Sequence, residues 1–343
     1  MRSPCTSTCC DWTREASRLS SRAQFDERVL RLSSLTFGVV LFLSGCPKPS
    51  ARSLPAPAPA PAPASTSTST STPPPPLPSS QLPDGGRVLF PTYRLVGFCG
   101  TPGAPALGEL LGDLPKKTKA LERYAEKYGD DRKVLPVFEL IAVVVMSTPG
   151  TDGKYRHRVS DAVIDEYLGA ARAAKALLLL NIQPGQSDFL TEVRHFEKYL
   201  REPDVGIALD PEWAMKGHQL PGRFYGQTTG AAINEVAEYL SGIVKEERLP
   251  EKAMVFHQVN KYVVKDEALL TPFPGVAIIK SVDGLGPKAA KIDTYRILAG
   301  NLGPGVHAGF KLFFDEDRRN GGTLMTAADV LALTPKPEYV MYE

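Results

Sequence analysis

Residues 176–210 read ALLLLNIQPGQSDFLTEVRHFEKYLREPDVGIALD and contain one complete repeat of the pattern from which the fold can be inferred. It begins with an apolar run at 176–183, continues through an amphipathic segment at 187–200 and ends in a second apolar run at 205–210. Both runs are apolar at consecutive positions, which is typical of strands buried on both faces of a parallel sheet. Ser187 before Asp188 is a favourable start for a helix. The stretch therefore predicts a strand, a helix and a second, parallel strand.

The same alternation extends over the whole of residues 87–343. Six further apolar runs lie at 94–100, 133–145, 252–259, 275–282, 307–314 and 338–342. Helix-like segments separate the runs at 109–128, 160–175, 229–248, 286–299 and 326–332, and 265–270 is only a short, weak one. This pattern predicts an α/β protein with a (β/α)8 TIM-type barrel, because that fold has eight strands and typically about 250 residues.

A doubly wound open sheet is the alternative that such a pattern leaves open. That fold binds dinucleotides through a G-x-G-x-x-G turn after its first strand, and no such turn follows the run at 94–100. We therefore expect neither a Rossmann-type site nor any other cofactor.

Residues 1–45 have the pattern of a signal peptide. The nine-residue apolar run 35–43, LTFGVVLFL, follows Arg28 and Arg31, and it is far shorter than the roughly 20 residues that span a bilayer. The sequence 43–46, LSGC, resembles a bacterial lipobox, in which the cysteine is acylated and becomes the mature N-terminus. We therefore expect export, cleavage before Cys46 and attachment to the cell membrane or outer membrane through that residue.

The region before Leu35 is long for the start of a signal peptide, and a misassigned start codon, with initiation near Val29 or Leu30, would explain it. Cys5, Cys9 and Cys10 also lie there, with no partner cysteine or histidine nearby that would favour a metal or redox cluster.

Residues 46–86 are rich in proline, alanine, serine and threonine, as in PAPAPAPAPASTSTSTSTPPPP. This composition cannot bury apolar surface, so the segment after Cys46 is predicted to be a disordered linker that holds the barrel away from a membrane. The chain has a net charge of +2 with interleaved signs, which gives no basic face for nucleic acid.

In a (β/α)8 barrel the active site lies at the carboxyl ends of the strands, so polar residues there are informative. The most specific sequence is VGIALDPEW, residues 205–213. An extended backbone through Pro211 would direct Asp210 and Glu212 to the same side, where mutual repulsion raises the pKa of one carboxyl. That carboxyl would then be a general acid near neutral pH. In the alternative interpretation Asp210 caps a loop and Glu212 pairs with Lys280 or Arg223.

Glycoside hydrolysis needs a second carboxylate across the scissile bond. Asp283, in SVDGLG, and Asp315, in FFDED, are the candidates because each follows a predicted strand. Both also have an ordinary interpretation: Asp283 before Gly284 is a common turn, and Asp315 belongs to an acidic triplet that would suit a solvated loop.

Other polar and aromatic residues near the same strand ends are expected to contact a substrate. They are Glu139, Gln183, Trp213, His257, Gln258 and Lys280. Phe98, Tyr225 and Phe314 are further aromatic residues expected near this face.

Seven short sequences in this chain resemble those of a known group of proteins. The most specific are ALDPEW (208–213) and NIQPGQSDFL (181–190), and the others are TPGAPALG (101–108), FELIA (138–142), FHQV (256–259), VDGLG (282–286) and FKLFFDED (310–317). The chain looks like an uncharacterised family of secreted bacterial proteins and lipoproteins that resembles glycoside-hydrolase-like barrels. The similarity extends over nearly all of 94–343. It implies a barrel fold and export, and it does not name a substrate.

The leading hypothesis is an extracytoplasmic glycoside-hydrolase-like barrel that acts on envelope or extracellular polysaccharide. Glu212 would be the acid/base, Asp210 would tune it, and Asp283 or Asp315 would be the nucleophile or base. A divalent-metal enzyme such as an isomerase or phosphodiesterase is one alternative, because Glu139, Asp210, His257 and Asp283 end different strands. The other is a carbohydrate-binding or scaffold lipoprotein without catalysis.

Overall fold

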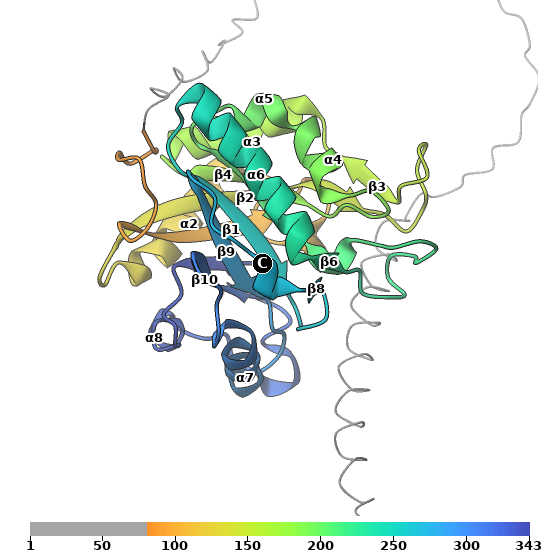
Figure 1. Ribbon diagram of the computed structural model, residues 1–343. Helices are drawn as coiled ribbons and strands as arrows, with labels where there is room; N and C mark the ends of the chain where they lie inside the picture. Colours follow the sequence, from red (N-terminus) through yellow and green to blue (C-terminus); the bar gives the residue numbers. More distant parts are fainter. Residues whose placement is uncertain (1–80) are drawn as a thin grey trace, which may run out of the picture.

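The computed structural model describes residues 81–343, and every structural statement below refers to that part of the chain. The signal peptide, Cys46 and nearly all of the linker lie outside the described residues. The described part contains a closed barrel of parallel strands with helices around it (Figure 1). The predicted (β/α)8 TIM-type fold is therefore confirmed.

Each of the eight apolar runs forms one barrel strand. The strands are β1 (Tyr93–Gly100), β2 (Lys133–Val145), β4 (Leu177–Ile182), β5 (Val205–Leu209), β7 (Lys252–Gln258), β9 (Val276–Val282), β10 (Val306–Leu312) and β11 (Tyr339–Tyr342). They pair in chain order, and β1 closes the barrel by pairing with both β2 and β11.

Alternate residues of each strand face the barrel axis or the helices. In β4, Leu178 and Leu180 pack in the large core that includes the helices, whereas Leu177 and Leu179 belong to the core inside the barrel. Small residues occur where neighbouring strands crowd the interior: a Cβ at Gly206 would lie 2.5 Å from the Ala253 carbonyl oxygen. This alternation decides which side chains reach the site.

The helices lie in the predicted segments. They are α2 (Leu114–Ala125), α3 (Asp161–Ala173), α4 (Phe189–His195), α5 (Glu197–Leu200), α6 (Gly230–Glu247), α7 (Lys288–Ala299) and α8 (Ala327–Leu331). The predicted helix at 187–200 is two pieces, and its N-cap is Asp188, whose side chain accepts from the Thr191 N–H. Asp113 and Thr229 cap α2 and α6 in the same way.

In the connection between β7 and β9, the 3-10 turn η4 (Glu267–Leu269) lies where the sequence predicted a weak helix. Just before it, β8 (Val264–Lys265) pairs in parallel with β6 (Thr228–Thr229). This pairing joins the loops that follow β5 and β7, as Figure 1 shows. A third short strand, β3 (Arg156–Arg158), is antiparallel to the end of β2.

The packed structure includes residues before Arg87. Leu82 and Leu89 are buried in the same core as the interior side chains of the barrel, and the Leu89 N–H donates to Glu251. Among the described residues, no helix combines the length and the apolar character needed to span a bilayer.

Candidate active site

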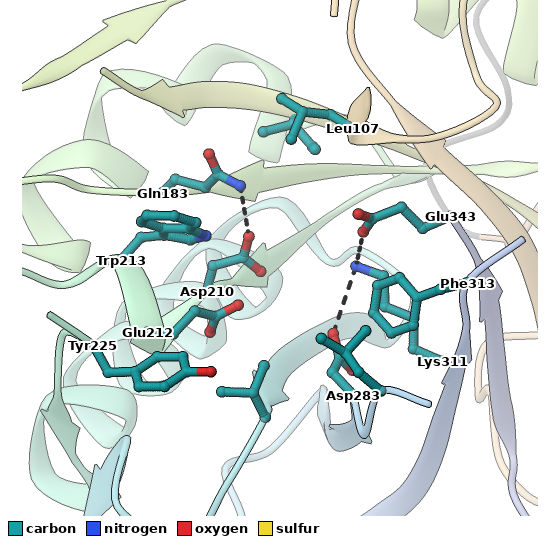
Figure 2. Close-up of a pocket in the computed structure, with 13 residues that line it drawn as sticks. Leu107, Gln183, Asp210, Glu212, Trp213, Tyr225, Asp283, Lys311, Phe313 and Glu343 are labelled. Atoms are coloured by element: carbon teal, nitrogen blue, oxygen red, sulfur yellow. Dashed lines mark hydrogen bonds and ion pairs between the residues drawn. The ribbon is translucent and has the colours of Figure 1, made fainter. Parts of the chain in front are cut away.

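A pocket lies at the carboxyl ends of the barrel strands (Figure 2). It is lined by Leu107, Ile141, Gln183, Asp210, Glu212, Trp213, Tyr225, Val259, Asp283, Leu285, Lys311, Phe313 and Glu343. Its volume is about 50 Å³, enough for a few water molecules. A larger ligand such as a sugar ring would therefore bind mainly at the mouth.

Asp210 directly follows β5 and is held by two amide side chains. Asn181 Nδ2 donates to Asp210 Oδ1 at 3.0 Å, and Gln183 Nε2 donates to Asp210 Oδ2 at 3.0 Å. Gln183 is itself fixed, because its Oε1 accepts from the Val145 N–H at 3.1 Å. Both oxygens of Asp210 are therefore oriented by residues from the neighbouring strand β4 and the residue after it.

Glu212 lies in the 3-10 turn η3 (Pro211–Trp213), so the extended backbone predicted through Pro211 is wrong. The turn nevertheless places Asp210 and Glu212 on the same pocket wall, as Figure 2 shows. The loop before β6 supports this turn, since the Gly226 N–H donates to the Glu212 carbonyl oxygen at 2.6 Å. Lys280 is not its partner, because Lys280 pairs with Glu267.

The Glu212 carboxyl group is buried and its Oε2 has no hydrogen-bond partner. Burial, followed by the negative charges of Asp210 and Asp283, raises its pKa well above the ordinary value. Burial also raises the pKa of Asp210, although the positive charges of His257 and Lys311 oppose that change. The surroundings of Glu212 thus favour its protonated form, and a second carboxyl group lies beside it in the pocket wall.

Below these residues, His257 of β7 lies between carboxylates from two other strands. Its Nδ1 is 2.9 Å from Asp283 Oδ2. Its Nε2 is 3.1 Å from Glu139 Oε1 and 4.0 Å from Asp210 Oδ1, but the N–H is aligned with neither oxygen and makes no hydrogen bond. All four groups lie inside the barrel with almost no solvent exposure.

These charges stabilise one another. Burial alone would lower the pKa of His257, but the charges of Asp283 and Glu139 outweigh burial and raise it well above 6.5. Burial would raise the pKa of Glu139 and of Asp283, yet the charge on His257 lowers each to about 2. These contacts therefore favour the imidazolium form of His257 and the ionised forms of both carboxyl groups.

Lys311 and Glu343 complete the opposite wall of the pocket. Lys311 Nζ lies 2.8 Å from Glu343 Oε2 and 3.5 Å from Asp283 Oδ2. Burial would lower the pKa of Lys311, but the charge of Glu343 and those of its other neighbours raise it well above the ordinary value. An ammonium ion with so high a pKa is unsuited to nucleophilic attack or Schiff-base formation.

The structure does not bring every predicted residue to the pocket. Asp315 is exposed in the turn after β10. Gln258 and Lys280 face away from the axis: Gln258 Nε2 donates to Glu267, and Lys280 Nζ donates to the Leu298 carbonyl oxygen at 2.5 Å. Their strands direct the neighbouring residues His257 and Ser281 inward.

The aromatic predictions divide in the same way. Trp213 and Tyr225 line the pocket. Phe98 and Phe314 pack instead with Tyr124 and Tyr342 outside the barrel interior, with ring centroids 6.1 Å apart for Phe98 and Phe314. Phe313, one residue earlier, is the pocket residue.

Sequence reasoning missed Lys311, Glu343 and Tyr339, whose hydroxyl donates to Glu139. A signal for Lys311 exists, since a lone lysine within the apolar run FKLFF must be paired if the run is buried. Glu343 has no comparable signal, because a glutamate after the last strand is usually solvated.

The four residues of the metal hypothesis, Glu139, Asp210, His257 and Asp283, do meet around the imidazole. Glu139 and Asp283, however, face the two ring nitrogens of His257 at 3.1 Å and 2.9 Å. Among residues 81–343, no group of three or more histidine, cysteine, aspartate or glutamate side chains is arranged to hold a metal ion. The cations His257 and Lys311 already neutralise the carboxylates there, so this donor set does not fit a metal.

Comparison of the chain with protein-family models gave no match, and comparison with the curated proteins gave none either. The geometry of the pocket therefore carries the functional argument.

Proposed function

We propose that the barrel is a glycoside-hydrolase-like enzyme in which Glu212 is the general acid. The observation that carries the proposal is the placement of Glu212: its buried carboxyl group lines the pocket, its Oε2 has no hydrogen-bond partner and Asp210 lies beside it. A general acid must hold its proton near the working pH, and burial together with the charge of Asp210 raises the pKa of Glu212 in the direction that this role needs.

Asp283 is the better candidate for the second carboxylate. It lines the pocket, whereas Asp315 is exposed in a turn. In Figure 2 Asp283 lies across the pocket from Glu212. Its pKa of about 2 keeps it ionised, so it would act as a base, as a nucleophile or as a counter-charge to an oxocarbenium-like transition state.

Asp210 has a supporting role in this scheme. Both of its oxygens accept amide hydrogen bonds, which orient it, and its negative charge favours the protonated form of Glu212. The aromatic side chains of Trp213, Tyr225 and Phe313 supply apolar surface for the faces of a sugar ring.

Cellular placement is a second part of the proposal. We infer export through the segment 1–45 and acylation of Cys46, with residues after it serving as a tether to the membrane and polysaccharide of the envelope as the ligand. The short apolar run 35–43 and the LSGC sequence at 43–46 support this view. Replacing Cys46 with Ala should move the protein from the membrane fraction to the soluble exported fraction, and unchanged membrane association would contradict acylation there.

The activity test is hydrolysis of a panel of polysaccharides, including peptidoglycan, by the wild-type protein and by Glu212→Gln. Glu238→Gln, at an exposed position on α6, is the matched control. Product release that is lost only in Glu212→Gln and survives EDTA supports the proposal. Loss of activity in EDTA would favour a metal enzyme, and binding without any release would favour a carbohydrate-binding lipoprotein.

A further inference from the structure

Two exposed aromatic rings lie on the loops beside the pocket. Among the described residues, Val88, Phe224, Tyr262, Leu269 and Ile297 are the exposed large apolar side chains, and Phe224 and Tyr262 are the aromatic members of that set. Their exposed fractions are 54% and 56%, so both side chains are accessible to a ligand.

Phe224 is tied to the acid by short stretches of chain. Its neighbour Tyr225 lines the pocket, and Gly226, two residues on, donates its N–H to the Glu212 carbonyl oxygen at 2.6 Å. The Gln227 N–H donates in turn to the Ala214 carbonyl oxygen at 2.9 Å. Phe224 is therefore one residue from the pocket lining, on the loop that supports the turn containing Glu212.

Tyr262 occupies the equivalent position on the next loop. Val259, three residues earlier, lines the pocket, and the carbonyl oxygen of Val263 accepts from the Thr228 N–H at 2.8 Å. The parallel pair β6 and β8 joins this loop to the one that carries Phe224. The two rings thus belong to a pair of connected loops that both contribute residues to the pocket, and we call Phe224 and Tyr262 the aromatic rim.

We propose that the aromatic rim binds further units of a polysaccharide chain while one unit occupies the pocket. The proposal rests on the function given above and narrows its substrate to a polymer that extends beyond the pocket. The pocket volume of about 50 Å³ leaves most of a bound sugar at the mouth, where neighbouring units would meet the rim.

The surroundings of the rings fit a glycan better than a protein partner. Arg223 and Lys261 are exposed beside them, and Lys261 Nζ lies 5.2 Å from the centre of the Tyr262 ring. Protein interfaces bury a continuous apolar core from which lysine is depleted. A sugar ring instead has apolar C–H faces and hydroxyl edges, which match separate aromatic rings set among polar side chains.

The test compares the full-length wild-type protein with the double variant Phe224→Ala/Tyr262→Ala. The polymer probes are laminarin, soluble starch, xylan, glycol chitin and peptidoglycan, with binding followed by gel retardation or pull-down. The short probe is the 4-nitrophenyl glycoside of the sugar that is released. Ile297→Ala is the matched control, because Ile297 is an exposed apolar residue near the end of α7, remote from the pocket mouth.

Loss of two ring contacts should weaken polymer binding and raise KM for the polymer by about tenfold, while kcat/KM on the short glycoside stays within about twofold. Ile297→Ala should match the wild type on both. If both proteins hydrolyse the polymer and bind it with equal affinity, the aromatic rim has no role in polymer binding, and the proposed function stands. Rim-dependent binding without hydrolysis would support the rim and contradict the acid. A wild-type protein that neither binds nor cleaves any probe would overturn both.

Discussion

His257 Nδ1 lies 2.9 Å from Asp283 Oδ2 inside the barrel, and this pair connects the floor of the pocket to its wall. The same ring faces Glu139 at 3.1 Å, so one cation serves two buried carboxylates from two other strands. Removing one member of a buried ion pair leaves its partners uncompensated, which typically costs about 3–5 kcal/mol.

Replacement of His257 with Gln should therefore lower the free energy of unfolding by about 3–5 kcal/mol near pH 6. The pKa of His257 is higher in the folded than in the unfolded protein, so its stabilising contribution is complete below pH 6.5 and is lost as the pH rises through the folded value. Urea unfolding from pH 5 to about pH 9 should show a decline in the wild type that is smaller in His257→Gln. Parallel curves would contradict a buried imidazolium.

The charge of Asp210 should be visible in the pH dependence of catalysis. The alkaline limb of kcat/KM reports deprotonation of Glu212, whose pKa is raised first by burial and then by the charge of Asp210. Asp210→Asn removes that charge and should shift the alkaline limb to lower pH, besides lowering the maximum. A limb that stays in place would show that Asp210 does not tune the acid.

Gly226 should be essential for the position of Glu212. A Cβ at this residue would lie 2.5 Å from both the backbone N and O of Ala214, so the turn that carries Glu212 would have to move. Gly226→Ala should lower kcat by at least tenfold, because displacements of about 1 Å are costly in active sites. Gly242→Ala in α6 meets no atom within 4 Å and should stabilise the protein by about 0.5–1 kcal/mol with normal activity.

Lys280 should contribute to stability and not to substrate binding, because it lies between the barrel strands and the surrounding helices. Its ammonium group pairs with Glu267 at 2.6 Å and donates to the Leu298 carbonyl oxygen, away from the pocket. Lys280→Met should lower the unfolding free energy by about 1–3 kcal/mol and leave kcat/KM of the folded protein within about twofold. A large loss of activity at unchanged stability would restore Lys280 as a substrate-binding residue.

The positions of the strands could be predicted from the sequence, because consecutive apolar residues such as Leu177 to Leu180 occur where both faces of a strand are buried. It also identified Asp210, Glu212 and Asp283, since residues that directly follow the strands of a barrel gather at one end. Closure of the barrel and the position of the pocket follow from these same runs.

Orientation was harder to predict, for a physical reason. A strand that is apolar on both faces does not reveal which alternate residues face the axis, so Gln258 and Lys280 were assigned to the wrong side. Glycines in the strands indicate the inward face, because Gly206 and Gly309 lie where neighbouring strands leave little room for a side chain. The turn at Pro211 was missed because proline is compatible both with extended chain and with the first turn of a helix.

Whether Glu212 supplies the proton for glycosidic bond cleavage can be measured as kcat of Glu212→Gln, the wild type and Asp315→Asn on one polysaccharide. We expect kcat to be lower by about 10²–10⁴ in Glu212→Gln, the usual size of a general-acid contribution, and Asp315→Asn to be close to the wild type. Wild-type turnover in Glu212→Gln, or loss of turnover in Asp315→Asn alone, would show that Glu212 is not the general acid.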